Sequence, residues 1–402
     1  MRRAVTRRTA TVLLAVLCLG ACTSGPGGKK PDPEPPVAYQ GNDAYPMPDT
    51  PFTRKGSVIT ASCLLGGRYA AVAVEAWDPD NWKRFDERLF AIPTDAAFSN
   101  VPGVEAVSSP LVDLCRQQGS ETSSPYRADS LEHLVPRIRS LFDLGYTRMA
   151  VVLRDPGGKG TYAGFVQHDD GQDEIVRLDD ATSDDEQNAV MSPDGGSVWF
   201  TYTTRSGERR IGSRAVEGDH RLSDEGPAAG HGLALTVSGK PPRAVQADMV
   251  RFSPNSRRLT ASVPKVFGNV FDVPDSSGSL TATSARNATL ASDCLGVVGW
   301  IDDSLLLCRA SSGSFQAVDA QSGRTVGAPI DVVGPDRWTV AQGMLVSTDG
   351  TRFVVAVHPP NDRYGEPGQQ PDFRVVSTAP GGRTIPIPGA GLTSDMVFLE
   401  WR

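Results

Sequence analysis

The thiols are the side chains with the most chemistry open to them, since a thiol can be oxidised, bind a metal or carry a lipid. Six of the 402 residues are cysteines. Four of them lie in the body of the chain: Cys63, Cys115, Cys294 and Cys308. In an oxidising compartment these four are expected to form two disulfides, with three possible connectivities. A metal site is the competing interpretation, but there are only five histidines and no C-x-x-C pair, which argues against it.

The positions favour one pairing. Cys294 and Cys308 flank a turn that we expect at residues 300–304, so they can face each other on neighbouring strands. The pair Cys63–Cys115 then follows by elimination.

The two remaining cysteines, Cys18 and Cys22, lie in a segment with the features of an export signal. Four arginines among the first eight residues precede an apolar run over residues 10–19. This run is far shorter than the roughly 20 residues that a helix needs to cross a bilayer. We therefore interpret residues 1–21 as a signal peptide.

The residues directly before Cys22, Leu19-Gly20-Ala21, resemble those of a bacterial lipobox. The resemblance implies transfer of diacylglyceryl to the Cys22 thiol, cleavage before Cys22, and anchorage to the outer face of the cell membrane. Two acyl chains make a stable anchor, whereas one would be marginal. An ordinary secreted protein with a chance cysteine at this position is the alternative.

The charge of the chain excludes one class of partner. The net charge is −7, and removal of residues 1–21 with their four arginines leaves 36 basic and 47 acidic side chains, a net charge of −11. An acidic mature chain argues against binding to nucleic acid and against electrostatic docking on anionic lipid. The lipid on Cys22 would have to hold it at the membrane.

The sequence lacks the common hydrolase motifs. It has no G-x-S-x-G and no H-E-x-x-H. Residues 155–161 superficially resemble a phosphate loop, but the first glycine is missing and Gly160 replaces the hydroxyl residue after Lys159. We interpret this stretch as a turn between strands, and we assign no catalytic residue, no metal site and no cofactor.

One stretch is rich in carboxylates, with nine acids in 18 residues. Such a cluster either binds calcium or is a solvated turn, and no D-x-[DN]-x-[DN]-G spacing favours calcium. The acids are Asp169, Asp170, Asp173, Glu174, Asp179, Asp180, Asp184, Asp185 and Glu186. Residues 78–81 are interpreted in the same way.

A recurring turn shows which elements position these residues. Ser192–Gly195 has the composition of a type I turn, and the strand after it carries large apolar groups on both faces. Similar turns recur, with Asp194, Asn255, Asp303 and Asp349 as equivalent positions at intervals of 61, 48 and 46 residues. This repeat is typical of an all-β propeller of about six, alternatively seven, four-stranded blades. A β-sandwich that reuses a common turn is the alternative.

We place the propeller at residues 57–402, after a Pro/Gly/Ser-rich disordered tether at residues 22–56. We expect strands at 57–64, 69–77, 88–92, 148–153, 161–168 and 174–178, and further units from about 188, 249, 295 and 343. A final strand at 396–401 is expected to pair with the first unit and close the ring. Tryptophans are expected between blades: Trp77, Trp199, Trp300, Trp338 and Trp401.

Residues 129–144 depart from the β pattern. Leu131, Leu134, Val135, Ile138 and Leu141 follow helical spacing. We expect a helix packed on the outside of the ring between the first two units, with Cys115 tying this excursion to the first unit. A partner-binding helix is the alternative.

The turn motifs resemble those of the TolB-like family, whose repeats carry an S-P-D-G turn. The match is full at 192–195, partial at 253–256 and 347–350, and loose at 301–304. The resemblance implies the propeller fold and a general role in binding proteins or envelope components. TolB itself has an N-terminal α/β domain and no lipobox, so its particular partners do not carry over.

Two functional hypotheses follow. The first is a lipid-anchored, extracytoplasmic propeller that serves as a protein-binding or scaffold module for an envelope protein or cell-wall component, and that is a monomer. The second is a propeller enzyme, lactonase- or lyase-like, with its active site in the central channel. A sensor subunit of a signalling system is a third option. Charged residues around a deep axial pocket would favour the enzyme.

Overall fold

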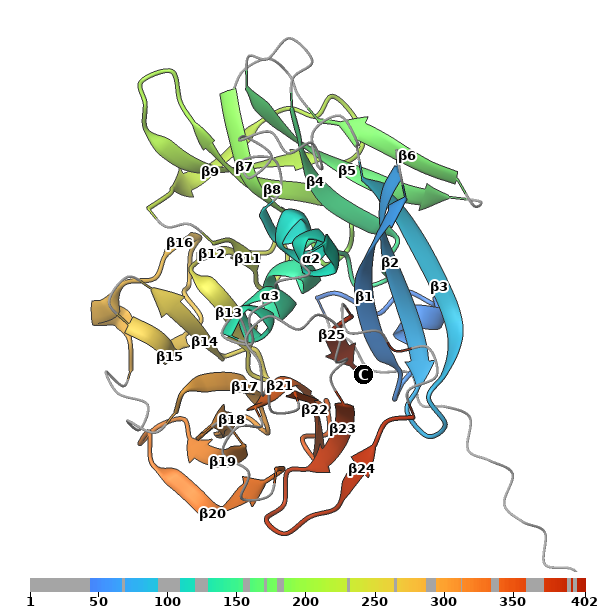
Figure 1. Ribbon diagram of the computed structural model, residues 1–402. Helices are drawn as coiled ribbons and strands as arrows, with labels where there is room; N and C mark the ends of the chain where they lie inside the picture. Colours follow the sequence, from blue (N-terminus) through green and yellow to red (C-terminus); the bar gives the residue numbers. More distant parts are fainter. Residues whose placement is uncertain are drawn as a thin grey trace, which may run out of the picture. The chain divides into compact units, whose positions relative to one another are not determined.

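The chain is described by a computed structural model (Figure 1). Its described residues are 44–66, 69–92, 109–119, 129–154, 160–169, 172–178, 184–229, 232–263, 266–286, 294–311, 313–333, 340–358, 372–388, 392 and 396–402. They lie in one compact unit, Ala38–Arg402. The predicted signal peptide, Cys22 and the first part of the predicted tether lie outside the described residues. Among the described helices, none is long and apolar enough to cross a membrane.

The described residues form seven small sheets, which we call blades 1 to 7 in chain order. Blades 1, 3, 6 and 7 have four strands, and blades 2, 4 and 5 have three. The strands of blades 1 to 3, in sheet order, are β25 (Val397–Trp401), β1 (Val58–Gly66), β2 (Tyr69–Asp78) and β3 (Lys83–Ile92); β4 (Arg148–Arg154), β5 (Thr161–Asp169) and β6 (Gln172–Arg177); and β10 (Ser223–Pro227), β9 (Arg209–Ala215), β8 (Ser197–Thr203) and β7 (Asp184–Met191).

Blades 4 to 7 complete the set. Their strands are β11 (Ala234–Leu235), β12 (Ala244–Gln246) and β16 (Gly278–Ser279); β13 (Asp248–Phe252), β14 (Arg258–Val263) and β15 (Val266–Asp272); β17 (Gly296–Trp300), β18 (Leu305–Arg309), β19 (Ser314–Asp319) and β20 (Thr325–Asp331); and β21 (Val340–Val346), β22 (Arg352–His358), β23 (Asp372–Ser377) and β24 (Thr384–Pro386). The described residues also form two α-helices, α2 (Ser109–Gly119) and α3 (Asp129–Arg139), and two 3₁₀ turns, Pro51–Thr53 and Ala282–Ser284.

Seven hydrophobic clusters join the seven blades into a closed ring. Each cluster has members on two successive blades, and the last one joins blade 7 to blade 1, as a propeller requires. Examples from the seven interfaces, in order, are Ile59 with Met149, Val152 with Phe200, Trp199 with Leu235, Val245 with Leu259, Val270 with Trp300, Phe315 with Phe353, and Val354 with Trp401. The propeller fold is thus confirmed, with the seven blades that were expected as the alternative to six.

Blade 4 was hard to find in the sequence. Its strands have only two or three residues, and β16 pairs in parallel with β12 although it follows blade 5 in the sequence. The first two strands of blade 4, β11 and β12, lie inside the interval of 61 residues between Asp194 and Asn255, which contains no further copy of the turn motif.

The ring is closed by strands from the two ends of the compact unit. β25 pairs antiparallel with β1, with Trp401 opposite Val58. This pairing was predicted, and it places the last strand at the inner edge of blade 1. Trp77, Trp199, Trp300 and Trp401 are buried at interfaces between blades, as predicted. Trp338 lies outside the described residues.

Three of the four predicted turns share one hydrogen-bond pattern. In each, a serine hydroxyl donates to the side chain two residues on: Ser192 to Asp194, Ser253 to Asn255, and Ser347 to Asp349. Each turn joins the first two strands of its blade in chain order.

The fourth turn departs from this pattern. Asp302, rather than the predicted Asp303, accepts the backbone N–H groups of Ser304 and Leu305. Asp303 instead accepts the backbone N–H of Asn255 at 2.8 Å, and so joins the turns of blades 5 and 6.

The folded part begins earlier than residue 57. Tyr45 and Phe52 are 1% and 0% exposed, so the segment that contains them packs against the propeller. The predicted boundary between tether and propeller is therefore too late. The sequence signal that was not used is the pair of aromatic residues, Tyr45 and Phe52, in an otherwise polar stretch.

Candidate functional site

The axis of the propeller is the first place to look for a site. α3 contacts β13, β17, β21 and β25, which belong to four different blades, and it also packs on α2. Figure 1 shows both helices at the centre of the ring. The predicted position outside the ring is therefore wrong. Helical spacing showed that one face of α3 is buried, but it did not show against which elements.

A cluster of charged side chains, the axial cluster, joins α3 to the closing strand. Oε2 of Glu400 accepts hydrogen bonds from Arg139 at 2.8 Å, from Tyr146 at 3.0 Å and from Arg402 at 3.0 Å. The guanidinium groups of Arg139 and Arg402 also lie 4.9 and 5.3 Å from the centroid of the Tyr146 ring. The side chain of Arg402 is fully buried, and that of Glu400 is 23% exposed.

The electrostatics of this cluster favour the ionised carboxylate. Burial alone would raise the pKa of Glu400, but the charges of Arg139 and Arg402 and the hydrogen bonds outweigh it and hold this pKa at about 2. Burial raises the pKa of Tyr146 above its usual value of 10, so the phenol stays protonated and donates. The two guanidinium groups also donate to backbone carbonyls, Arg139 to that of Phe142 and Arg402 to those of Phe52 and Leu144. Among the described residues, Nε of Arg402 is buried without a hydrogen-bond partner.

Residues 44–53, which we call the strap, pack against the axial cluster. Phe52 stacks near Tyr146 with ring centroids 5.7 Å apart, and its carbonyl accepts from Arg402 at 3.0 Å. Thr50 donates to the carbonyl of Gly145 at 3.4 Å. The strap thus packs on the turn that follows Phe142 and on the end of β25.

The beginning of the strap reaches blades 3 and 4. The Nζ atom of Lys240 lies 5.6 Å from the centroid of the Tyr45 ring and 2.8 Å from Asp194 Oδ2. Burial and the charge of Asp194 raise the pKa of Tyr45 to about 12.

α3 also lies near Asp248 and Met249, where β13 begins. α3 and the strap are linked through the axial cluster, because Arg139 and Arg402 both donate to Glu400 and Arg402 also donates to the carbonyl of Phe52.

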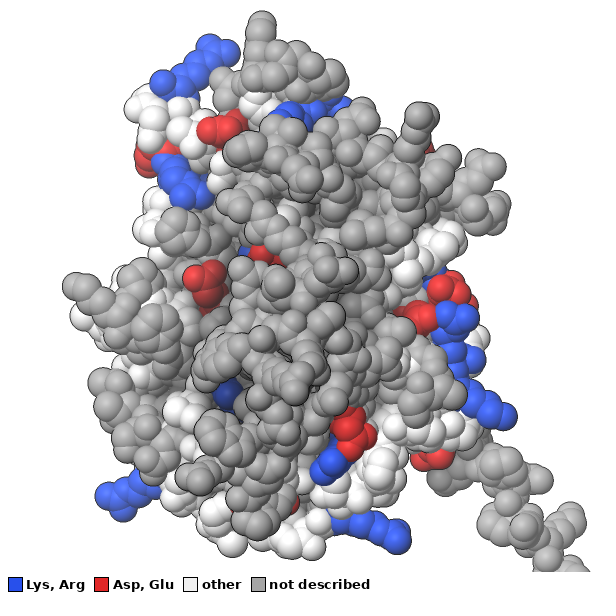
Figure 2. Space-filling model, viewed as in Figure 1, with Lys and Arg blue, Asp and Glu red and all other residues white. Residues whose placement is uncertain are grey.

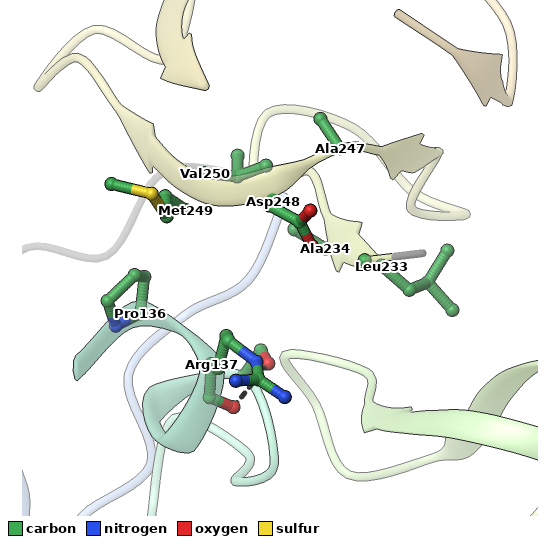
Figure 3. A pocket seen from close by; sticks show the side chains of 10 residues that line it. Pro136, Arg137, Leu233, Ala234, Ala247, Asp248, Met249 and Val250 are labelled. Atoms are coloured by element: carbon green, nitrogen blue, oxygen red, sulfur yellow. Dashed lines mark hydrogen bonds between the residues drawn. The ribbon is translucent and has the colours of Figure 1, made fainter. Parts of the chain in front are cut away.

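A small cavity lies between α3 and blades 4 and 5 (Figure 3). Pro136 and Arg137 line one side of it, and Leu233, Asp248 and Met249 line the other. Its volume is about 20 Å³. This is room for roughly one water molecule, and a substrate needs a far larger pocket.

The acidic stretch is only partly described, and its last member is not solvated. Glu186 and Arg214 form an ion pair at 2.7 Å in which both side chains are 0% exposed. The second carboxylate oxygen of Glu186 accepts from the backbone N–H of Ala163 at 2.7 Å, so the pair joins blade 2 to blade 3. A solvated turn is therefore the wrong interpretation for Glu186.

The described residues contain no group of three or more His, Cys, Asp or Glu side chains placed to hold a metal ion. In the turn at residues 78–81, Asp78 accepts from the backbone N–H of Asp80 and from the side-chain amide of Asn81. Its oxygens thus bond within the turn.

Both predicted disulfides are present. Cys63–Cys115 joins β1 to α2, and Cys294–Cys308 joins the segment before β17 to β18. The first holds α2, and through it α3, at the axis.

Sequence reasoning missed one turn and the axial cluster. Residues 143–147 form a turn in which Asp143 accepts the backbone N–H groups of Thr147 and Arg148. The signal was Asp143 and Gly145 just before the apolar strand β4. The cluster had a weaker signal, namely Glu400 and Arg402 on either side of Trp401 in an otherwise apolar closing strand.

The fold defines the chain as a seven-bladed β-propeller with helix α3 packed against the inner strands of four blades. No protein-family model matches the chain, and no curated protein matches it either. Similar solved structures include TolB from Acinetobacter baumannii, with 13% identity, coverage of 86% of this chain and 83% of that one, and a TM-score of 0.27.

Other solved structures resemble the chain to a similar degree. The periplasmic gluconolactonase of Pseudomonas aeruginosa has 12% identity, 86% and 83% coverage, and a TM-score of 0.37. A eukaryotic initiation factor has 8% identity, 90% and 97% coverage, and a TM-score of 0.38. The likeness is one of fold, and it transfers no function.

Proposed function

We propose that the chain is a lipid-anchored, extracytoplasmic β-propeller that binds a protein or cell-wall component as a scaffold module of the cell envelope. One observation carries the proposal: α3, the axial cluster and the strap fill the axis, where a propeller enzyme would hold its substrate. We therefore expect the partner to bind on the outer surface of the blades. A large, rigid ring with many surface loops suits that role.

The location rests on two further observations. Residues 1–22 have the composition of a lipoprotein signal. The chain holds two disulfides, and such bonds persist in oxidising compartments.

The anchor is tested with Cys22→Ala. We expect this variant to be released into the medium or to remain as an unprocessed precursor. Cys18→Ala is the matched control, because Cys18 leaves with the signal peptide, and this variant should stay anchored. If Cys22→Ala stays at the membrane at its mature size, lipid anchoring is wrong.

The scaffold role is tested by photo-crosslinking in the native membrane. Photoreactive residues replace exposed side chains on the rim, such as Arg257 and Arg324, and a second set replaces buried axial side chains such as Ile138. We expect one discrete conjugate from rim positions and none from axial ones. Failure of every rim position to give a conjugate would contradict the proposal.

The alternative is a lactonase- or lyase-like enzyme with an axial site. The ionisable groups of the axial cluster are the observation that favours it, since such groups are the usual acids and bases of catalysis. It requires a lactone substrate to reach Glu400. We therefore assay the purified wild-type chain and the Glu400→Gln variant on a panel of lactones. Turnover by the wild-type chain that is lost in the variant would support the enzyme hypothesis over the scaffold hypothesis.

A further inference from the structure

The two disulfides differ in what they hold together. Cys63–Cys115 joins strand β1 to helix α2 across a separation of 52 residues. Cys294–Cys308 joins two segments that the backbone hydrogen bonds of blade 6 already hold side by side. One of these bonds runs from the N–H of Leu295 to the carbonyl of Arg309 at 2.8 Å. β17 and β18 therefore stay paired when the Cys294–Cys308 bond opens.

The two disulfides also differ in exposure. Cys63 and Cys115 are 0% and 2% exposed. Cys308 is also buried, but Cys294 is partly exposed, at the border of the apolar cluster between blades 5 and 6. Thiol–disulfide exchange requires access of a thiolate to one of the two sulfurs. Among these four cysteines, Cys294 is therefore the one at which exchange can begin.

Each sulfur of Cys294–Cys308 has a partner at hand for the reduced state. Gln316 on β19 lies directly opposite Cys308, so the two side chains share a face of the sheet, with their Cβ atoms about 5 Å apart. Among the described residues, Nε2 of Gln316 is buried without a hydrogen-bond partner. Sγ of Cys294 lies 3.7 Å from the carbonyl oxygen of Gly296. After reduction, sulfur 308 can accept from Gln316 and the thiol of residue 294 can donate to Gly296.

The surroundings of the other disulfide have a different character. The residue opposite Cys63 on β2 is Val72, which is apolar and 0% exposed. A buried donor without a partner, such as Nε2 of Gln316, is costly in a folded protein. This cost has an explanation if the donor serves the reduced form of Cys308.

We propose that Cys294–Cys308 is a redox-active disulfide that exchanges with a protein dithiol. A thiolate of the partner attacks Sγ of Cys294, the bond between the two sulfurs breaks, and Cys308 leaves as a thiolate that accepts from Gln316. The second thiol of the partner then attacks the partner's own sulfur in the mixed disulfide, and Cys294 leaves in turn. Overall, two electrons and two protons pass from the partner's thiols to Cys294 and Cys308, and the partner becomes a disulfide.

The residue after Cys294 offers a contact for such a partner. Leu295 is 58% exposed, the highest value among the described large apolar side chains. Figure 2 shows the described acidic and basic side chains interspersed over the face that it presents, without a patch of one sign. We therefore expect the partner to recognise the site through an apolar contact with Leu295.

Selective reduction of the full-length wild-type chain is the first test. The folded protein is incubated with dithiothreitol or with thioredoxin, and free thiols are alkylated and located by mass spectrometry. We expect Cys294–Cys308 to be reduced about tenfold faster than Cys63–Cys115, or more, while tryptophan fluorescence stays unchanged. A thioredoxin variant with a single thiol should be trapped on Cys294. Reduction of both disulfides at one rate together with unfolding, or of Cys63–Cys115 first, overturns the proposal.

Gln316→Met tests the partner of the reduced form, because it removes the donor at similar size. In a glutathione buffer it should shift the equilibrium about tenfold toward the disulfide, since a hydrogen bond to the thiolate is lost. Gln342→Met is the matched control: Gln342 is also buried with an unpartnered side-chain atom, but it lies opposite Ala356. Equal shifts in the two variants, or no shift in Gln316→Met, contradict the proposal. If Gln316→Met does not fold, the selectivity of the wild-type chain decides.

Leu295→Ala tests whether the reductant is a protein. It should slow reduction by thioredoxin roughly tenfold and leave reduction by dithiothreitol unchanged, because only the protein buries this side chain. Ile385→Ala, at a position on β24 that is 48% exposed, should change neither rate. Equal slowing with both reductants, or an unchanged rate with thioredoxin, overturns recognition at Leu295 and with it a protein dithiol as the partner.

Discussion

The carboxylate of Glu400 is expected to stabilise the propeller strongly, and Glu400→Gln removes its charge at nearly constant volume. In the native protein the pKa of Glu400 is about 2, compared with an ordinary value of 4.5. This lowering of the Glu400 pKa on folding corresponds to about 3 kcal/mol of unfolding free energy at neutral pH. The variant also leaves the buried guanidinium of Arg402 without its carboxylate partner.

The pH dependence has a definite sign. Because the pKa of Glu400 is lowered on folding, its contribution is complete above about pH 4.5 and is lost as the pH falls toward 2. The wild-type protein should therefore lose about 3 kcal/mol from this group over that window, and Glu400→Gln should not. The difference in unfolding free energy between the wild-type protein and Glu400→Gln should therefore become smaller as the pH falls.

The assay is urea unfolding followed by tryptophan fluorescence, at neutral pH and near pH 3. We expect the unfolding free energy of Glu400→Gln to be about 3 kcal/mol lower at neutral pH, with a melting temperature lower by roughly 4 °C for a unit of this size. Glu208→Gln is the matched control, because Glu208 pairs with Arg210 at the surface and is 55% exposed. It should change the free energy by less than about 0.5 kcal/mol. A Glu400→Gln variant as stable as the control would refute the reasoning.

Three further predictions concern the same interior. Cys63→Ala removes the Cys63–Cys115 disulfide and should lower the unfolding free energy by about 4 kcal/mol, because this bond closes a loop between cysteines 52 residues apart. The variant should also be cleaved more readily by proteases within α2. Glu186→Gln should lower the unfolding free energy measured in urea by about 3–5 kcal/mol, because it leaves the fully buried guanidinium of Arg214 without its carboxylate partner. Gly350→Ala should lower the melting temperature more than Gly207→Ala does: both glycines have positive φ, but only at Gly350 would a Cβ overlap a backbone oxygen, that of Ile301.

The sequence predicts well whatever depends on local pattern. Ser192, Pro193 and Asp194 have the chemistry of a tight turn wherever they stand, so the hairpins could be located. The cysteine pairing followed because Cys294 and Cys308 lie on either side of one such turn. The closing strand could be predicted because its apolar residues had no other partner near the end of the sequence.

What depends on distant contacts could not be predicted in the same way. The apolar face of α3 is equally consistent with a place on the rim or at the axis, and only the assembled inner strands decide between them. Glu400 and Arg139 meet across 261 positions of sequence. Blade 4 escaped notice because strands of two or three residues carry no periodic pattern.

The pairing of β1 with β25 has a consequence for how the chain folds. β1 is synthesised early, yet its neighbour in the sheet is the last described strand, so blade 1 stays incomplete until nearly the whole of this sequence has been made. Closure of the ring therefore depends on contacts between segments far apart in sequence, and such contacts form slowly. Until β25 is in place, the first sheet presents an unpaired strand edge, which other strands can bind.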